Sequence, residues 1–249
     1  MTDSIPLGPC DAAALAFFLV VWVFFALAAD GRLFNRPSLT QAMNRQRIVW
    51  MRTMARRELR MIDTGIMTGL QQGTAFFASS SLIAIGGCFA LLGATDEAIM
   101  VLADLPFVAA PARGLVEIKI LGLVALLAYS FFKFGWSYRL FNYCAILIGA
   151  VPVIKDEAGH KAETEAAVMR AARMNILAGK HFNAGLRGIF FSIGYLGWLV
   201  GPAVFIATTL VLLAVLVRRQ FFSAARAAVI DGLDQPGPGN GESTRPVSQ

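Results

Sequence analysis

The feature that most constrains this chain is a run of thirty residues, Gly188 to Val217, that contains no charged side chain. A helix needs about 20 apolar residues to cross the ~30 Å hydrocarbon core of a bilayer. Residues 12–29 and 64–95 are also uncharged, and residues 115–136 carry charges only toward their ends. The hydrophobic content of 57% and the charged content of 15% are unusual for a soluble domain. We therefore predict an integral membrane protein.

The predicted fold is all-α: a polytopic membrane helical bundle of about four transmembrane helices with helical cytoplasmic extensions, in one membrane domain over residues 1–234. The predicted spans are residues 12–30, 70–94, 115–136 and 188–217. Gly197, Gly201 and Pro202 offer an alternative, a re-entrant hairpin in the last span, but each arm would have only about 15 residues. One kinked helix is the preferred interpretation. The Pro/Gly/Ser-rich residues 235–249 are expected to form a disordered tail.

The charges of the loops predict an orientation. The loop between the first two spans is rich in arginine, whereas the loop between the second and third has more acidic than basic residues. Because Lys and Arg are enriched in cytoplasmic loops, we expect the first loop in the cytoplasm and the N-terminus outside, in the bacterial inner membrane. A single crossing by residues 188–217 then leaves Arg218, Arg219 and Arg226 outside, in conflict with the rule.

A basic amphipathic helix is predicted after the first span. Ser38 and Gln41 have the spacing of a capping box, and apolar residues recur at helical spacing behind them. The arginines on another side are Arg45, Arg52, Arg56 and Arg60. This helix either lies on the inner leaflet, with these arginines on anionic lipid head groups, or is a solvated extension of the second span. Since lipid explains the net charge of +6, we expect no nucleic-acid partner.

Glycines at intervals of four predict close helix packing. Gly65, Gly69 and Gly73 lie on one face at the start of the second span, and Gly197 and Gly201 form a weaker pair. Small residues at this spacing let two membrane helices approach closely. A homo-oligomer or another membrane protein is the partner that such a face indicates.

Motifs for catalysis and cofactor binding are missing from the sequence, which has no phosphate loop, GxSxG elbow or HExxH. His160 and Glu163 are three residues apart, but no further ligand completes a metal site. His181 has no membrane-embedded partner that would indicate haem. We therefore expect no metal, no cofactor and no catalytic residue, and we favour a non-enzymatic role.

Two clusters of aromatic and polar side chains lie at the predicted inner membrane boundary, in residues 131–143 and 181–188. Asn and Arg occur within one turn in both clusters, so we predict that they meet across the bundle as a hydrogen-bonded polar layer. Its candidate residues are Asp63, Arg139, Asn142, Tyr143, Asn183 and Arg187. The alternative is an ordinary interfacial belt of aromatic residues and snorkelling arginines.

Several short motifs follow one another along nearly the whole chain. They are Met61-Ile62-Asp63-Thr64, Gly69-Leu70-Gln71-Gln72, residues 76–82, Glu117-Ile118-Lys119, residues 131–139, Phe141-Asn142-Tyr143, residues 181–187, Gly197-Trp198, Pro202 and Arg218-Arg219. As a set they resemble the membrane proteins grouped as the domain-of-unknown-function 599 family. The resemblance implies a multi-pass integral membrane protein, and it implies no activity.

Three functions stay open at the level of the sequence. The favoured one is a non-enzymatic helical scaffold or accessory protein of a membrane assembly with lipid contacts, because of the glycine face and the basic helix. The second is a small-solute or ion conduit, with a polar lining of Ser79, Ser80, Ser81, Gln71, Gln72, Asn142 and Asn183. The third is an enzyme that acts on lipid.

Overall fold

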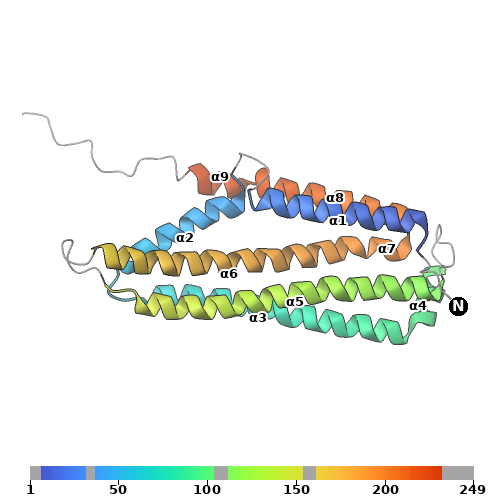
Figure 1. Ribbon diagram of the computed structural model, residues 1–249, viewed down its shortest axis with the longest axis horizontal. Helices are drawn as coiled ribbons and strands as arrows, with labels where there is room; N and C mark the ends of the chain where they lie inside the picture. The colour runs from blue at the N-terminus through green and yellow to red at the C-terminus, as the bar shows by residue number, and fades with distance from the viewer. Residues whose placement is uncertain (1–6, 32–36, 104–111, 154–160, 232–249) are drawn as a thin grey trace, which may run out of the picture.

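The computed structural model describes residues 7–31, 37–103, 112–153 and 161–231, and these residues contain helices and turns but no strand. The helices are α1 (Pro9–Ala29), α2 (Leu39–Ala55), α3 (Met61–Gly93), α4 (Thr95–Ala103), α5 (Arg113–Ala150), α6 (Lys161–Tyr195), α7 (Gly197–Val200), α8 (Pro202–Phe221) and α9 (Ala224–Asp231). Figure 1 shows α6 between the α1–α8 pair and the α3–α5 pair. The prediction of an all-α helical bundle is confirmed. The predicted tail, residues 235–249, lies outside the described residues.

Four stretches of helix are long and apolar enough to cross a membrane: Pro9–Ala29, Met61–Gly93, Arg113–Ala150 and Pro202–Ile230. The third is much longer than the predicted span 115–136. With 38 residues, α5 extends over roughly 57 Å, well beyond the thickness of a hydrocarbon core. Residues 140–150 are thus an extension of the helix, which ends just before Pro152, a residue that cannot continue the hydrogen-bond ladder.

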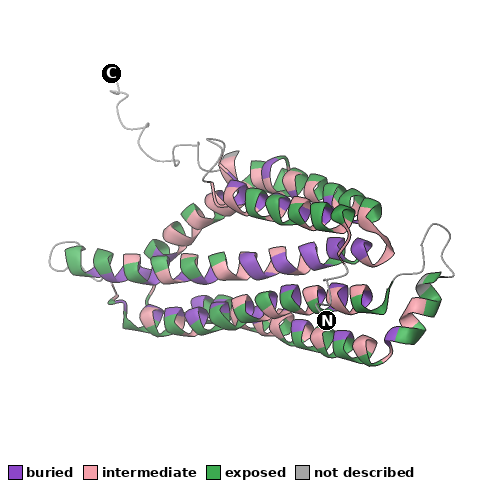
Figure 2. Ribbon diagram, turned by 45° about the vertical axis from the view of Figure 1, so that its right-hand side comes forward, coloured by how far each residue is buried: buried purple, intermediate pink, exposed green. Residues whose placement is uncertain are grey.

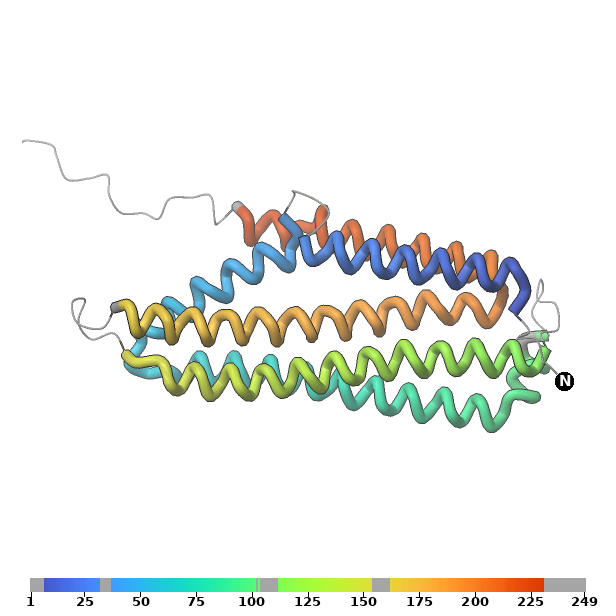
Figure 3. The backbone as a smooth tube through the Cα atoms, in the orientation of Figure 1, coloured from blue at the N-terminus to red at the C-terminus, as the bar shows by residue number. Residues whose placement is uncertain are grey.

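The single kinked helix predicted over residues 188–217 is wrong, because the chain reverses direction between α6 and α8 (Figure 3). Thr208 of α8 donates a hydrogen bond from Oγ1 to the Gly194 carbonyl oxygen (2.8 Å). Pro202 lies in the first turn of α8, where its missing N–H costs nothing. The objection that each arm would be too short fails because α6 begins as early as Lys161 and supplies a long arm.

The helix directions give the bundle two distinct ends. At the left of Figure 1 lie α2, α9, the end of α5 and the start of α6; we call this the basic end. The opposite end, with α4 and α7, is the far end. Because α8 returns toward the basic end, Arg218, Arg219 and Arg226 lie at the same end as the arginines of α2. The reversal therefore removes the conflict with the positive-inside rule.

A compact corner joins α1 to α2. As predicted, Ser38 and Gln41 form a capping box: Gln41 N donates to Ser38 Oγ (3.2 Å), and Ser38 N donates to Gln41 Oε1 (2.9 Å). The Ser38 hydroxyl also donates to the Ala29 carbonyl oxygen at the end of α1 (2.9 Å). Gly31 has a φ of 77° and lies directly against the Gln41 side chain, so no larger residue fits there.

Two hydrophobic cores fill the bundle, one toward each end. The far-end core is rich in aromatic side chains and includes Phe18, Phe191, Tyr195, Trp198 and Phe205. The basic-end core consists largely of Met, Ala and Cys and includes Met51, Met54, Cys144, Ala171 and Ala172. In Figure 2 many of the buried residues lie on α6, the central helix, whereas α3 at the edge is mostly exposed or intermediate. The helix α6 thus contributes to both cores.

Candidate functional site: polar and charged clusters between the helices

The predicted polar layer does not form as one layer. Asn142 of α5 accepts a hydrogen bond from Gln71 Nε2 of α3 (2.7 Å), and Arg139 donates from Nε to the exposed Tyr143 hydroxyl (2.7 Å). The antiparallel register of α5 and α6 is set by Ser137, whose Oγ donates to the Ala178 carbonyl oxygen (2.8 Å). In this register Asn142 lies opposite about residue 173 of α6, so Asn142 and Asn183 are roughly 15 Å apart along the bundle axis. The two clusters do meet, but through aromatic rings: the ring centroids of Phe134 and Phe182 are 5.7 Å apart, and those of Trp136 and His181 are 6.4 Å apart. The predicted hydrogen-bonded layer that joins the two asparagines is therefore wrong.

Asp63 is bound by α2 and the turn that follows it, and not by the predicted arginines. Its carboxylate is fully buried and accepts hydrogen bonds at Oδ1 from Trp50 Nε1 (2.7 Å) and Arg57 Nη1 (2.8 Å). Its other oxygen, Oδ2, has no partner among the described residues. Because a buried carboxylate is costly without donors, this cluster fixes the position of α2 against the start of α3.

A second buried cluster, centred on Arg47 and Asn175, was missed by the sequence analysis. Arg47 Nη1 donates to the backbone oxygen of Asn175 (3.2 Å) and to its side-chain Oδ1. The Asn175 amide lies 3.5 Å from Met67 Sδ and 3.6 Å from Cys144 Sγ. Four helices, α2, α3, α5 and α6, meet at this point. Gly179 makes the approach feasible, because a Cβ there would lie 2.8 Å from Arg47 Nη2.

The Arg47 guanidinium forms no ion pair with a carboxylate among the described residues. Burial lowers its pKa below the ordinary value, but arginine remains protonated in proteins. Its charge is therefore balanced only by neutral oxygens of Asn175. This arrangement could not be predicted, since Arg47 is one arginine in an arginine-rich segment.

The four arginines assigned to lipid head groups differ in their surroundings. Arg52 pairs with Glu165 of α6 (2.7 Å), both side chains being about half exposed, and Arg60 donates to the carbonyl oxygens of Ile148 (2.8 Å) and Pro152 (3.2 Å). Arg45 and Arg56 are exposed and bond to no described residue. Since α2 ends at Ala55 and buries Met51 and Met54 against the bundle, it is neither a continuation of α3 nor a helix with its apolar face free for lipid.

Both ends of α1 carry a carboxylate that pairs with cations of other helices. At the far end, Asp11 Oδ1 lies 3.5 Å from Lys119 Nζ and accepts a hydrogen bond from Trp198 Nε1 (2.6 Å). Toward the basic end, Asp30 lies 3.4 Å from Arg187 Nη1 and 3.8 Å from Lys180 Nζ. Arg187 thus belongs to an ion pair with α1. The Lys119 side chain is only 5% exposed, so it does not snorkel to a surface.

The predicted packing glycines fall into two groups. Gly197 lies directly against Thr208 of α8. An added Cβ at Gly65, Gly69, Gly73 or Gly201 would meet nothing within 4 Å, so these four have open space around them among the described residues. The contacts that do need glycine were missed: a side chain at Gly185 would collide with Phe134, and one at Gly188 with Ser130.

The polar groups suggested as the lining of a conduit are separated from one another. Ser80 and Ser81 donate to carbonyl oxygens of their own helix, at Phe76 and Phe77, whereas Gln72 and Ser79 are exposed on the outer side of α3. Gln71 and Asn142 bond to each other. Within the described part of the chain, no group of three or more His, Cys, Asp or Glu side chains is arranged to hold a metal ion; His160 lies outside it.

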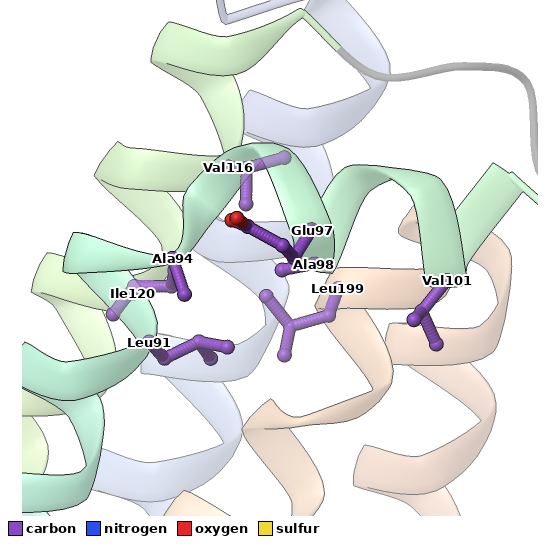
Figure 4. Close-up of a pocket in the computed structure, with 8 residues that line it drawn as sticks. All are labelled: Leu91, Ala94, Glu97, Ala98, Val101, Val116, Ile120 and Leu199. Atoms are coloured by element: carbon purple, nitrogen blue, oxygen red, sulfur yellow. The ribbon is translucent and has the colours of Figure 1, made fainter.

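A groove with a volume of about 380 Å³ lies at the far end. It lies between the end of α3, α4, the start of α5 and α7 (Figure 4). Its lining residues are Leu91, Ala94, Glu97, Ala98, Val101, Val116, Ile120 and Leu199. Glu97 is the one charged residue among them. None of the groups proposed for a conduit lines this groove.

Comparison with protein families gives one match, over residues 13–225, to the family described as "Protein of unknown function, DUF599". The match contains all four apolar stretches except the start of the first and the end of the fourth. No curated protein and no solved structure matches the chain.

Proposed function

The chain belongs to the DUF599 family of proteins of unknown function, and we propose that it is a non-enzymatic membrane scaffold that self-associates through the outer face of α3. The main support for this proposal is the exposure of α3. α3 is a membrane-length helix that packs along α5, and only 11% of its most apolar window is buried. Such a helix has room for a partner along most of its length.

The residues on the outer face of α3 support a protein partner over lipid. An added Cβ at Gly65, Gly69, Gly73, Gly86 or Gly87 would meet nothing within 4 Å, so a second backbone has free access. Gln72 and Ser79 are exposed on the same side. Lipid tails offer no hydrogen-bond partner to such side chains, whereas small and polar residues are the ones that join membrane helices.

In the proposed topology five helices cross the bacterial inner membrane: α1, α3, α5, α6 and α8. The crossing part of α6 contains Lys180 and Arg187, which both pair with the single carboxylate of Asp30. The basic end lies in the cytoplasm with the C-terminus, and the N-terminus and α4 lie outside. The exposed Arg45 and Arg56 contact anionic head groups of the inner leaflet.

Disulfide cross-linking tests the self-association. In a variant without the native Cys10, Cys88 and Cys144, Gly69→Cys or Gly73→Cys is oxidised in native membranes, and a covalent dimer is expected on gel electrophoresis. The matched control is Leu210→Cys on α8, which is 49% exposed and lies away from the glycine face; it should give little dimer.

A second measurement separates assembly from folding. Gly69→Leu should lower the dimer fraction, measured by energy transfer between labelled copies in lipid nanodiscs, without changing the unfolding of the monomer. A wild-type chain that stays monomeric in nanodiscs would contradict the proposal, as would equal cross-linking at positions 69 and 210.

A further inference from the structure

The groove between α3, α4, α5 and α7 combines an apolar lining with one carboxylate. Seven of its eight lining residues are Leu, Ile, Val or Ala. Figure 4 shows the Glu97 side chain projecting from α4 beside the groove, and this side chain is exposed, so its carboxylate lies at the rim. A ligand in the groove would thus meet apolar walls and a negative charge together.

The carboxylate of Glu97 belongs to an exposed side chain and has no direct partner of its own, because it forms no hydrogen bond or ion pair with a described residue. The cation of this rim, Arg113, is already bonded to two other carboxylates, Asp96 Oδ2 (2.9 Å) and Glu117 Oε1 (2.9 Å). Three carboxylates therefore share one guanidinium, and the mouth of the groove keeps a negative charge that attracts cations.

We infer that this groove is a binding site for a small lipophilic cation, in which an apolar body fills the groove and the positive charge pairs with Glu97. The volume of about 380 Å³ lies in the range of sites for small molecules, roughly 300–1,000 Å³. The inference does not depend on self-association, because no residue of the glycine face lines the groove.

Two ions of the same shape and opposite charge test the site. Tetraphenylphosphonium and tetraphenylborate are titrated separately into the full-length protein in a non-ionic detergent, and binding is measured by calorimetry. The wild-type protein should bind the phosphonium ion at least about tenfold more tightly than the borate ion, a difference of ~1.4 kcal/mol. Equal affinity for the two ions would overturn the inference.

Two substitutions and one control test whether the phosphonium ion binds in this groove. Glu97→Gln keeps the shape of the groove but removes its charge, and should weaken phosphonium binding by about tenfold. Ala98→Phe fills the groove and should weaken the binding of either ion. Glu165→Gln removes a carboxylate of α6 at the basic end and should change nothing. Phosphonium binding that survives either groove substitution unchanged would refute the inference, since the ion would then lie elsewhere.

Discussion

The two cores of the bundle are built from different side chains. In the far-end core, Phe18 contacts Phe191, Tyr195 and Phe205 with ring centroids 5.0 to 5.7 Å apart, and Trp198 stacks on Phe205. In the basic-end core, Ala171 and Ala172 are fully buried, and the polar Asn175 lies among them. Large rings fill the space between helices in one core, whereas small residues bring backbones and polar groups together in the other.

The difference corresponds to two ways of holding helices together. Lipid tails are as apolar as leucine, so helices in a membrane gain little from burying apolar surface, and close packing and polar contacts must hold them. The interlocking rings of the far-end core and its Asp11–Lys119 pair satisfy that condition. At the basic end, α2 does not span the membrane, and hydrogen bonds to α3 and α6 attach it to the bundle.

The largest expected effect comes from the far-end core. Phe18→Ala removes a ring that is 1% exposed and should lower the free energy of unfolding by about 3–5 kcal/mol, measured by chemical denaturation in detergent with tryptophan fluorescence. Val20→Ala, at an α1 position that is 66% exposed, should stay within about 0.5 kcal/mol of wild type. Similar losses of unfolding free energy at the two positions would mean that ring packing does not dominate the stability of this core.

The basic-end core should be more sensitive to loss of a polar group than to loss of volume. Asn175→Leu keeps the size of the side chain but leaves Arg47 without its amide oxygen, at an expected cost of about 1–3 kcal/mol. With Arg47→Met in a double-mutant cycle, the coupling should be about 0.5–3 kcal/mol. Strict additivity of the two substitutions would show that the hydrogen bond contributes nothing to stability.

Two glycines, one between packed helices and one on the outer face of α3, sharpen the comparison further. Gly185→Leu places a side chain against Phe134 and should cost about 1–3 kcal/mol through overpacking. Gly69→Leu meets open space and should leave the unfolding of the monomer unchanged within about 0.5 kcal/mol. Thermal unfolding in a detergent that keeps the protein monomeric measures both; a larger loss at position 69 contradicts the outward position of that face.

The smallest effect is expected at the exposed Arg52–Glu165 pair. Because both side chains are about half exposed, solvent screens the pair, and Glu165→Gln should cost less than about 1 kcal/mol. The difference from wild type should shrink further as salt is raised from 0.05 to 0.5 M, values chosen so that the screening length falls from roughly 14 to 4 Å. A loss that persists in high salt would show that the pair is more shielded than its exposure indicates.

The apolar spans and the helix caps were predictable because their signals are local. The uncharged runs predicted α1 and α3, and the spacing of Ser38 and Gln41 predicted the start of α2. The α6–α8 reversal was not predicted, although Gly197, Gly201 and Pro202 marked it, because the charges of Lys180 and Arg187 hid the apolar character of α6. Their partner Asp30 lies far away in the sequence.

The polar clusters were harder to predict because they depend on the register between helices. Arg139, Asn142 and Tyr143 share a helix face as expected, yet the register of α5 against α6 separates them from Asn183. Arg47 and Asn175 meet only because α2 crosses the extended part of α6, whose length the sequence did not indicate. The outward position of Gly69 likewise depends on which side of α3 meets α5.

The position of α1 has a consequence for how the protein is made. Its main neighbour is α8, which lies near the end of the chain. Phe18 therefore has no Phe205 ring to pack against until α8 has been synthesised. At ~5–20 residues per second the delay is on the order of 10 s or more. Until Lys119 and Arg187 have been inserted, the carboxylates of Asp11 and Asp30 lack the cations with which they pair in the folded bundle. The first helix therefore enters the membrane before its packing partners have been made. In a truncated chain that lacks α8, this helix would remain accessible to chaperones and membrane proteases.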